Sequence, residues 1–184
     1  MKSTMKYINL QEICKELNIY EFGVASWPLP ENAKSILYES NPCPFTAANV
    51  EKRLLGTSLF TPKSAIVCLF PYYVEHKAPS NLSRYTWATD YHLVINEYLK
   101  KLIEKLQIMN TDAQFSIHCD TSPLADRYMA YLAGLGFYGK NNCFISPKWG
   151  SYVMIGTILT TLELEPDTPL TQSCMGCNRC ITAC

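Results

Sequence analysis

Several features are missing from this sequence. Its 16 basic and 16 acidic side chains give a formal net charge of zero, so no chain-wide basic field indicates nucleic acid or an anionic membrane as a partner. No apolar run approaches the roughly 18 residues that span a bilayer, and the opening residues carry no apolar signal segment. The P-loop spacing and internal repeats are also absent. These absences argue against membrane and secreted proteins, and predict a cytoplasmic chain.

Cysteine, in contrast, is abundant. Nine cysteines occur in 184 residues, and Cys174, Cys177, Cys180 and Cys184 form a C-x2-C-x2-C-x3-C run. This spacing is typical of ferredoxin-type domains that hold [4Fe–4S] clusters, in which the fourth cysteine usually ligates a second cluster. We therefore interpret these four cysteines as cluster ligands. No later cysteine completes either set, so we expect the front part of a longer protein, inactive as it stands.

Two other uses of the cysteine run fit less well. A disulfide framework suits small secreted chains, and zinc sites more often pair two C-x2-C knuckles across a longer gap. The remaining cysteines stand mostly in apolar settings and are expected to be buried thiols. A chain with this many cysteines and no signal segment fits a reducing cytoplasm.

Alternating helix and strand patterns predict an α/β (α+β) fold with a mixed sheet flanked by helices. Helices are expected at residues 10–18, 31–39, 90–109 and from Ser122-Pro123 to about Leu135, with one or two helical turns at residues 47–55. Strands are expected at residues 22–26, 64–70 and 115–119. Residues 143–146 and 152–160 are interpreted as a hairpin. The predicted boundaries are 1–162 for the main domain, 163–173 for a linker and 174–184 for the start of the iron–sulfur module.

Three stretches carry possible chemistry. Asp120 follows a strand and precedes a helix, where a partly desolvated carboxyl could hold and donate a proton, although the residues alone favour an ordinary turn aspartate. The glycine-rich turn at residues 134–142, with Lys140 and Asn141, could bind an anion or could simply end a helix. Arg84 and Tyr85 open an aromatic-rich segment that could line a pocket for a flat macrocycle.

In their order along the chain, these stretches resemble the epoxyqueuosine reductase family. The resemblance is carried by Arg84-Tyr85, Asp120-Thr-Ser-Pro-Leu, Ala133-Gly-Leu-Gly-Phe-Tyr-Gly-Lys140 and the cysteine run. It covers residues 83–184, whereas the first eighty residues match only loosely. It implies a cobalamin-binding domain followed by a module with two [4Fe–4S] clusters in the intact protein.

The resemblance also implies a reaction and partners. Members reduce epoxyqueuosine to queuosine in tRNA, with electrons from an external donor such as flavodoxin or ferredoxin. Asp120 would donate a proton to the departing epoxide oxygen, and cobalamin would supply the difficult chemistry. Arg84, Tyr85, Asp120, Lys140 and Asn141 would contact the cobalamin.

Two departures from the family pattern keep alternatives open. Residues 41–61 differ from the usual segment, and Asn141-Asn142-Cys143 replaces the usual polar residues after Lys140. A paralogue with the same cofactors and another substrate, a ferredoxin-like electron carrier, and a corrinoid-handling domain without catalysis therefore remain in competition with the reductase interpretation.

Overall fold

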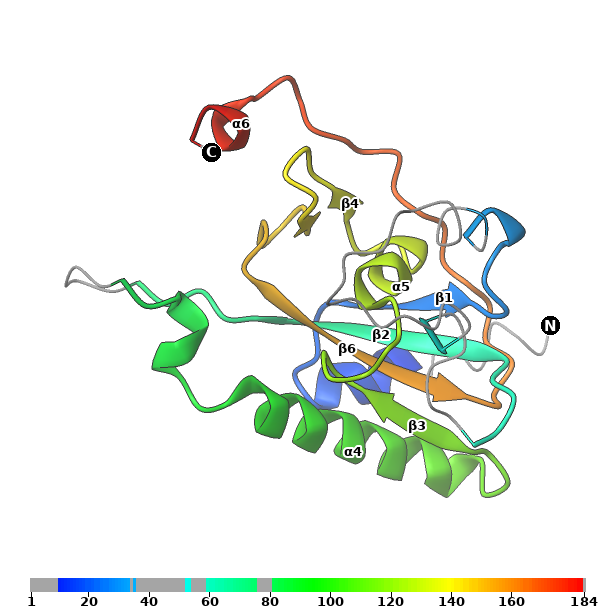
Figure 1. The fold of residues 1–184 in the computed structure, drawn as a ribbon. Coiled ribbons are helices and arrows are strands. Elements are labelled where there is room, and N and C mark those ends of the chain that lie inside the picture. The colour runs from blue at the N-terminus through cyan, green and yellow to red at the C-terminus, as the bar shows by residue number, and fades with distance from the viewer. Residues whose placement is uncertain (1–9, 34, 36–51, 54–58, 76–80, 184) are drawn as a thin grey trace.

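The computed structural model describes residues 10–33, 35, 52–53, 59–75 and 81–183. Its centre is a four-stranded sheet in the order β1-β2-β6-β3 (Figure 1). The strands are β1 (Phe22–Ser26), β2 (Ser64–Pro71), β3 (Phe115–His118) and β6 (Val153–Thr160). Every described pair is antiparallel, where the sequence predicted a mixed sheet, and the α+β class is confirmed.

Both faces of the sheet are covered because β2 is apolar on both faces. Alternate residues of a strand point to opposite sides. Ala65, Val67 and Leu69 therefore join one buried cluster, while Ile66 and Cys68 join the other. This explains the continuous apolar run in the sequence, which predicted a buried central strand.

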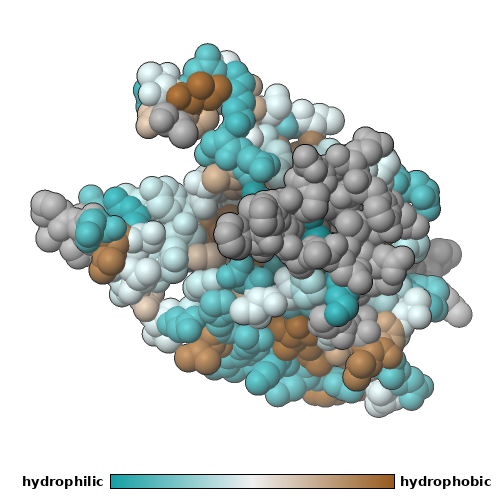
Figure 2. Space-filling model, in the orientation of Figure 1, coloured by the Kyte–Doolittle hydropathy of each residue, from teal (hydrophilic) through white to brown (hydrophobic). Residues whose placement is uncertain are grey.

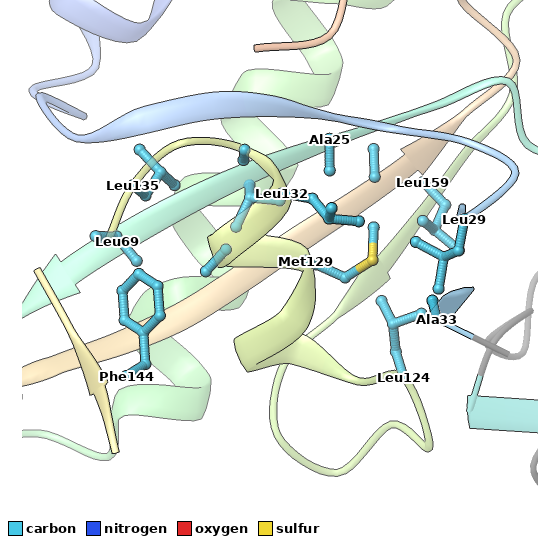
Figure 3. Close-up of a cluster of buried hydrophobic side chains, with 14 residues drawn as sticks. Ala25, Leu29, Ala33, Leu69, Leu124, Met129, Leu132, Leu135, Phe144 and Leu159 are labelled. Carbon is cyan, nitrogen blue, oxygen red and sulfur yellow. The ribbon is translucent and has the colours of Figure 1, made fainter. Parts of the chain in front are cut away.

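One face of the sheet carries α5 (Asp126–Leu132). Figure 3 shows Met129 and Leu132 of this helix directed at the sheet, beside Phe144 and Leu159. The opposite face is covered by α4 (Tyr91–Met109) together with the helix at residues 10–16. The domain is thus three layers deep, with a core on each side of the sheet.

The long helix α4 agrees with its prediction to within one residue. Ile95, Leu99, Leu102 and Leu106 are its buried residues, at the spacing of one helical face. Asp90 is its N-cap and accepts the backbone N–H of His92 at 2.9 Å. The helix therefore presents its first turn, with Tyr91 and His92, at a fixed place beside the sheet.

One predicted helix start and one predicted strand pairing differ from the structure. The helix after Ser122 begins only at Asp126, because Ser122 is held by His118 and the backbone from Ser122 to Ala125 forms turns. Of the predicted hairpin between residues 143–146 and 152–160, only the tight turn is present, closed by an antiparallel bridge between Ser146 and Gly150. Instead β5 (Phe144–Ile145) pairs with β4 (Phe137–Tyr138), while β6 lies between β2 and β3. Both segments of the predicted hairpin contain a strand, but each strand pairs with a different partner from the one predicted.

The predicted helix over residues 31–39 is helical at 31–33 and 35, and the helical turns proposed for residues 47–55 are helical at 52–53. The remaining residues of these two predictions lie outside the described part. No helix in the described ranges is long and apolar enough to cross a membrane.

The C-terminal segment leaves the domain along β1. Asp167 accepts the Val24 N–H through its side chain at 2.8 Å and donates its own N–H to the Val24 carbonyl at 2.8 Å. The chain then extends to α6 (Arg179–Ala183), which projects from the body in Figures 1 and 2. Its tip bears apolar side chains, and Met175 and Ile181 are exposed.

Candidate functional site

A cavity of about 950 Å³ opens between α5, the start of α4, the loop after β3 and the start of β6. Aromatic and apolar side chains make up much of its wall, and a few charged groups converge on it. The described residues that line it include Tyr85, Tyr91, Asp120, Asp126, Arg127, Tyr128, Tyr131, Tyr138, Asn142, Val153, Met154, Ile155 and Arg53. This combination is typical of a ligand-binding pocket.

Asp120 lies on the loop after β3, as predicted, and its carboxyl is held by the first turn of α4. The Tyr91 hydroxyl donates to Asp120 Oδ2 at 2.5 Å, and His92 Nε2 lies 3.6 Å from the same oxygen. The ring of His92 stacks on that of Tyr91, and its Nδ1 lies 2.8 Å from Asp90 Oδ1. A hydroxyl and an imidazole therefore converge on one carboxylate oxygen.

The side chain of His118 holds the loop that carries Asp120 in place. This buried histidine lies 2.7 Å from Ser122 Oγ through Nδ1 and 3.0 Å from Ser116 Oγ through Nε2. Burial lowers the pKa of His118, which favours the neutral ring. Ser122 Oγ also accepts the Leu124 N–H at 3.1 Å. A neutral histidine thus fixes both ends of the turn around Asp120.

The desolvated carboxyl of this site is Asp126 rather than Asp120. The Asp120 side chain is 67% exposed. Burial, followed by the nearby charge of Asp120, raises the pKa of Asp126 to about 7. Its Oδ1 is buried without a hydrogen-bond partner. Sequence reasoning missed Asp126, because one more acidic residue at a helix start is an ordinary pattern.

Of the two predicted residues in the aromatic-rich segment, only Tyr85 is part of the cavity wall. Tyr85 lines the cavity and meets the Tyr91 ring at a centroid distance of 5.8 Å. Arg84 donates to the Val74 carbonyl at 2.7 Å and lies over the Tyr73 ring at 4.8 Å.

The glycine-rich turn faces the cysteine segment. Lys140 Nζ donates to Asn178 Oδ1 at 2.8 Å, and the Lys140 backbone N–H points to Cys174 Sγ at 3.4 Å. Asn141 Oδ1 accepts the Cys143 N–H at 3.2 Å. Gly134, with a φ of 69°, ends α5, so the helix-end interpretation of this turn is confirmed.

The cysteine segment is open in this structure. Cys174, Cys177 and Cys180 are free thiols: Cys174 and Cys177 lie on the segment before α6 and Cys180 lies within α6, while Cys184 is outside the described residues. Gly176 has a φ of 75°, which lets the chain turn between the first two cysteines. Within the described residues, no three His, Cys, Asp or Glu side chains converge as a metal site.

Fold and site define a class of protein: an α+β domain with a largely aromatic and apolar cavity that also holds the carboxyls of Asp120 and Asp126, followed by a cysteine-rich segment. A family model described as "Epoxyqueuosine reductase QueG, DUF1730" matches residues 55–121. The epoxyqueuosine reductase of Synechocystis sp. is 36% identical over 142 residues, which cover 74% of this chain and 49% of the relative. That of Lactococcus garvieae is 30% identical over 197 aligned positions, covering 100% of this chain and 56% of the relative. The chain belongs to the epoxyqueuosine reductase family, and spans about half the length of these curated relatives.

Solved structures of epoxyqueuosine reductases have the same fold as this chain. An epoxyqueuosine reductase from Bacillus subtilis, whose aspartate-bearing catalytic loop is described as swung out of the active site, superposes with a TM-score of 0.85 at 29% identity, covering 99% of this chain and 52% of that one. An epoxyqueuosine reductase with an epoxyqueuosine-modified tRNA stem loop gives 0.80 at 27% identity, covering 98% and 52%. A reductive dehalogenase shares the fold alone, at 14% identity and a TM-score of 0.58.

Proposed function

We propose that this chain is the cofactor-binding and catalytic half of an enzyme that reduces epoxyqueuosine to queuosine in tRNA. Family membership supports the reaction, and the relative solved with a modified tRNA stem loop supports the substrate class. The observation that carries the proposal is the geometry around Asp120, which places a carboxyl, a tyrosine hydroxyl and an imidazole at one end of a cavity of ligand size.

The cavity fits a corrin on chemical grounds. Its apolar wall from Val153 to Ile155 and its tyrosine rings suit a flat macrocycle. The buried, unpartnered Asp126 Oδ1 requires an N–H or O–H donor, which the carboxamides at a corrin edge provide. We infer that Tyr85, Tyr128 and Asp126 hold the cobalamin. Arg84, Lys140 and Asn141 stay predictions as further contacts.

Loss of the epoxide oxygen as water consumes an electron pair and two protons. Cobalamin supplies the reducing chemistry when bound, and Asp120 delivers a proton to the departing oxygen. Asp120 is exposed at the mouth of the cavity, within reach of a substrate that enters from solvent. Tyr91 orients its carboxyl through the bond to Oδ2, which leaves Oδ1 to carry the proton.

We infer that the four cysteines belong to [4Fe–4S] clusters that pass electrons from a flavodoxin or ferredoxin to the cavity. The Lys140 N–H on Cys174 Sγ is the kind of bond that thiolate ligands accept. The turn with Lys140 follows β4, whose Tyr138 lines the cavity, so the cysteine segment is connected to the cavity wall. The buried free thiols Cys14, Cys68 and Cys119 suit a reducing cytoplasm.

Anaerobic titration of the 184-residue chain with reduced cobalamin tests the proposal, with absorbance and calorimetry as readouts. We expect saturable binding that weakens at least tenfold in Val153→Trp, which fills the cavity, and stays unchanged in Leu93→Trp on exposed α4 surface. An extended protein should then reduce epoxyqueuosine in a tRNA stem loop and lose that activity in Asp120→Asn.

Two outcomes would favour the competing functions. Absence of binding in both the chain and the extended, cluster-loaded protein would contradict the corrinoid assignment and favour an electron carrier. Binding with full turnover in Asp120→Asn would contradict the role of Asp120.

A further inference from the structure

Two arginines from distant parts of the chain line the cavity, and the proposed reaction uses neither. Arg127 is the second residue of α5, and Arg53 lies in the helical residues 52–53. A main-chain hydrogen bond joins these two segments, because the Ala125 N–H at the start of α5 donates to the Arg53 carbonyl at 3.2 Å. Both arginines are partly buried and belong to the cavity wall, so they lie on one side of the same space.

The turn after β4 forms the wall next to this pair. Arg127 Nη1 donates to the Asn142 carbonyl at 2.5 Å, which holds the guanidinium against that turn. Tyr138 of β4 lines the same part of the cavity. Burial raises the pKa of its phenol, and the positive charges of Arg127 and Arg53 partly offset that rise. Both guanidinium charges therefore act at one part of the cavity wall.

The charge at this part of the wall suits an anion. Among the described residues, no carboxylate forms an ion pair with Arg53 or Arg127. A guanidinium has five N–H donors in a planar fork, and the Asn142 carbonyl takes one from Arg127. Of the two carboxyls on the cavity, Asp120 is held by α4, and burial raises the pKa of Asp126 to about 7. The negative charge beside the pair is therefore only partly present at neutral pH.

We propose that Arg53 and Arg127 form a subsite for a phosphodiester at the end of the cavity bounded by the turn after β4. Planar guanidiniums bind phosphate oxygens through two parallel hydrogen bonds, so this pair suits a group that shares one negative charge between two oxygens. Two ligands of the proposed function carry such a group, namely the nucleotide tail of cobalamin and the RNA backbone. The inference rests on the proposed function for these ligands, and deepens it by naming a part of the ligand that no residue assigned above would bind.

Calorimetric titration of the 184-residue chain with cobalamin and with cobinamide, which has the corrin but no phosphodiester tail, tests the subsite. We expect Arg53→Gln and Arg127→Gln each to weaken cobalamin binding at least tenfold, because each loses a charge-assisted contact. Cobinamide binding should stay within twofold of the wild type in both variants, which also shows that the cavity is intact. Arg179→Gln, at an exposed position in α6, should change neither affinity.

A stem-loop RNA added to the extended, cobalamin-loaded protein tests the second source of the phosphodiester. If the RNA backbone is the ligand, the variants at Arg53 and Arg127 keep their cobalamin affinity and bind the stem loop at least tenfold more weakly than Arg179→Gln does. Fluorescence anisotropy at one fixed salt concentration measures this difference. The inference is overturned if both variants keep both affinities, or if cobalamin and cobinamide binding weaken equally.

Failure of the proposed function is seen separately, as a wild-type chain and an extended protein that bind neither corrinoid. Dimethyl phosphate, a bare phosphodiester, then tests the subsite alone. It should shift the Nε–Hε NMR signals of Arg53 and Arg127 in the 184-residue chain and leave that of Arg179 in place. Equal shifts at all three arginines, or none at Arg53 and Arg127, would contradict the subsite.

Discussion

Replacing Asp126 by asparagine should change how the stability of the domain depends on pH. Burial raises the pKa of Asp126 from 3.8 to about 7, so the folded state binds this proton more tightly than the unfolded chain does. Stability from this group is therefore fully present below about pH 3.8 and is lost as pH rises through about 7. At ~1.4 kcal/mol per pH unit, the loss between pH 5 and pH 8 is about 2–3 kcal/mol.

Asparagine has nearly the same shape and does not titrate. The free energy of unfolding of Asp126→Asn, relative to the wild type, should therefore rise by about 2–3 kcal/mol between pH 5 and pH 8. Urea denaturation followed by circular dichroism at both pH values measures this difference, since titrations elsewhere in the chain cancel. Asp112→Asn provides the control of an exposed carboxyl. Wild type and Asp126→Asn with parallel pH dependences would refute the assignment of a buried, proton-holding carboxyl.

Three further predictions concern the site and the core. Tyr91→Phe removes the hydroxyl that orients Asp120. Turnover of an extended enzyme should fall about tenfold, because a lost hydrogen bond of roughly 1.5 kcal/mol corresponds to that factor. Cobalamin affinity, measured by calorimetry, should stay unchanged. Leu99→Ala should lower the free energy of unfolding by about 2–5 kcal/mol in urea, whereas Leu93→Ala on the exposed side of the same helix should cost under about 0.5 kcal/mol; equal losses would contradict the packing of α4. Gly156→Ala should cost about 1–3 kcal/mol in the same assay, because the added Cβ would lie 2.7 Å from Ile95 Cγ2 and 3.0 Å from Leu99 Cδ1; an unchanged midpoint would show that these side chains move aside.

Local patterns predicted much of the fold. The continuous apolar run of β2 and the helical stripe of α4 are each local patterns that extend over many residues, and both elements lie within one residue of their predicted bounds. Pairing could not be predicted in the same way. β6 follows β5 closely in sequence, yet pairs with β2 and β3, because its eight residues complete the buried sheet and the two-residue β5 cannot.

The sequence predicted a site residue only where the evidence lay in that residue's own local segment. Asp120 was a candidate from its place between a strand and a helix and was singled out only by the family resemblance, and the structure places it on the cavity. Asp126 and the Tyr91 contact to Asp120 were missed, because each depends on a distance between elements far apart in the chain. Burial of a carboxyl is a tertiary property, and Asp126 carries no local mark of it in the sequence.

The glycine-rich turn links the two halves of the proposed chemistry. Its first glycine ends α5, and two further glycines let the turn approach β5, since a Cβ on Gly139 would lie 2.5 Å from Ile145 Cδ1. The turn then reaches Lys140, which contacts Cys174 and Asn178. The helix that begins with Asp126 is thus connected within fifteen residues to the segment with the cysteines. The wall of the cavity and the cysteine segment are therefore joined by one short stretch of chain, residues 134–140.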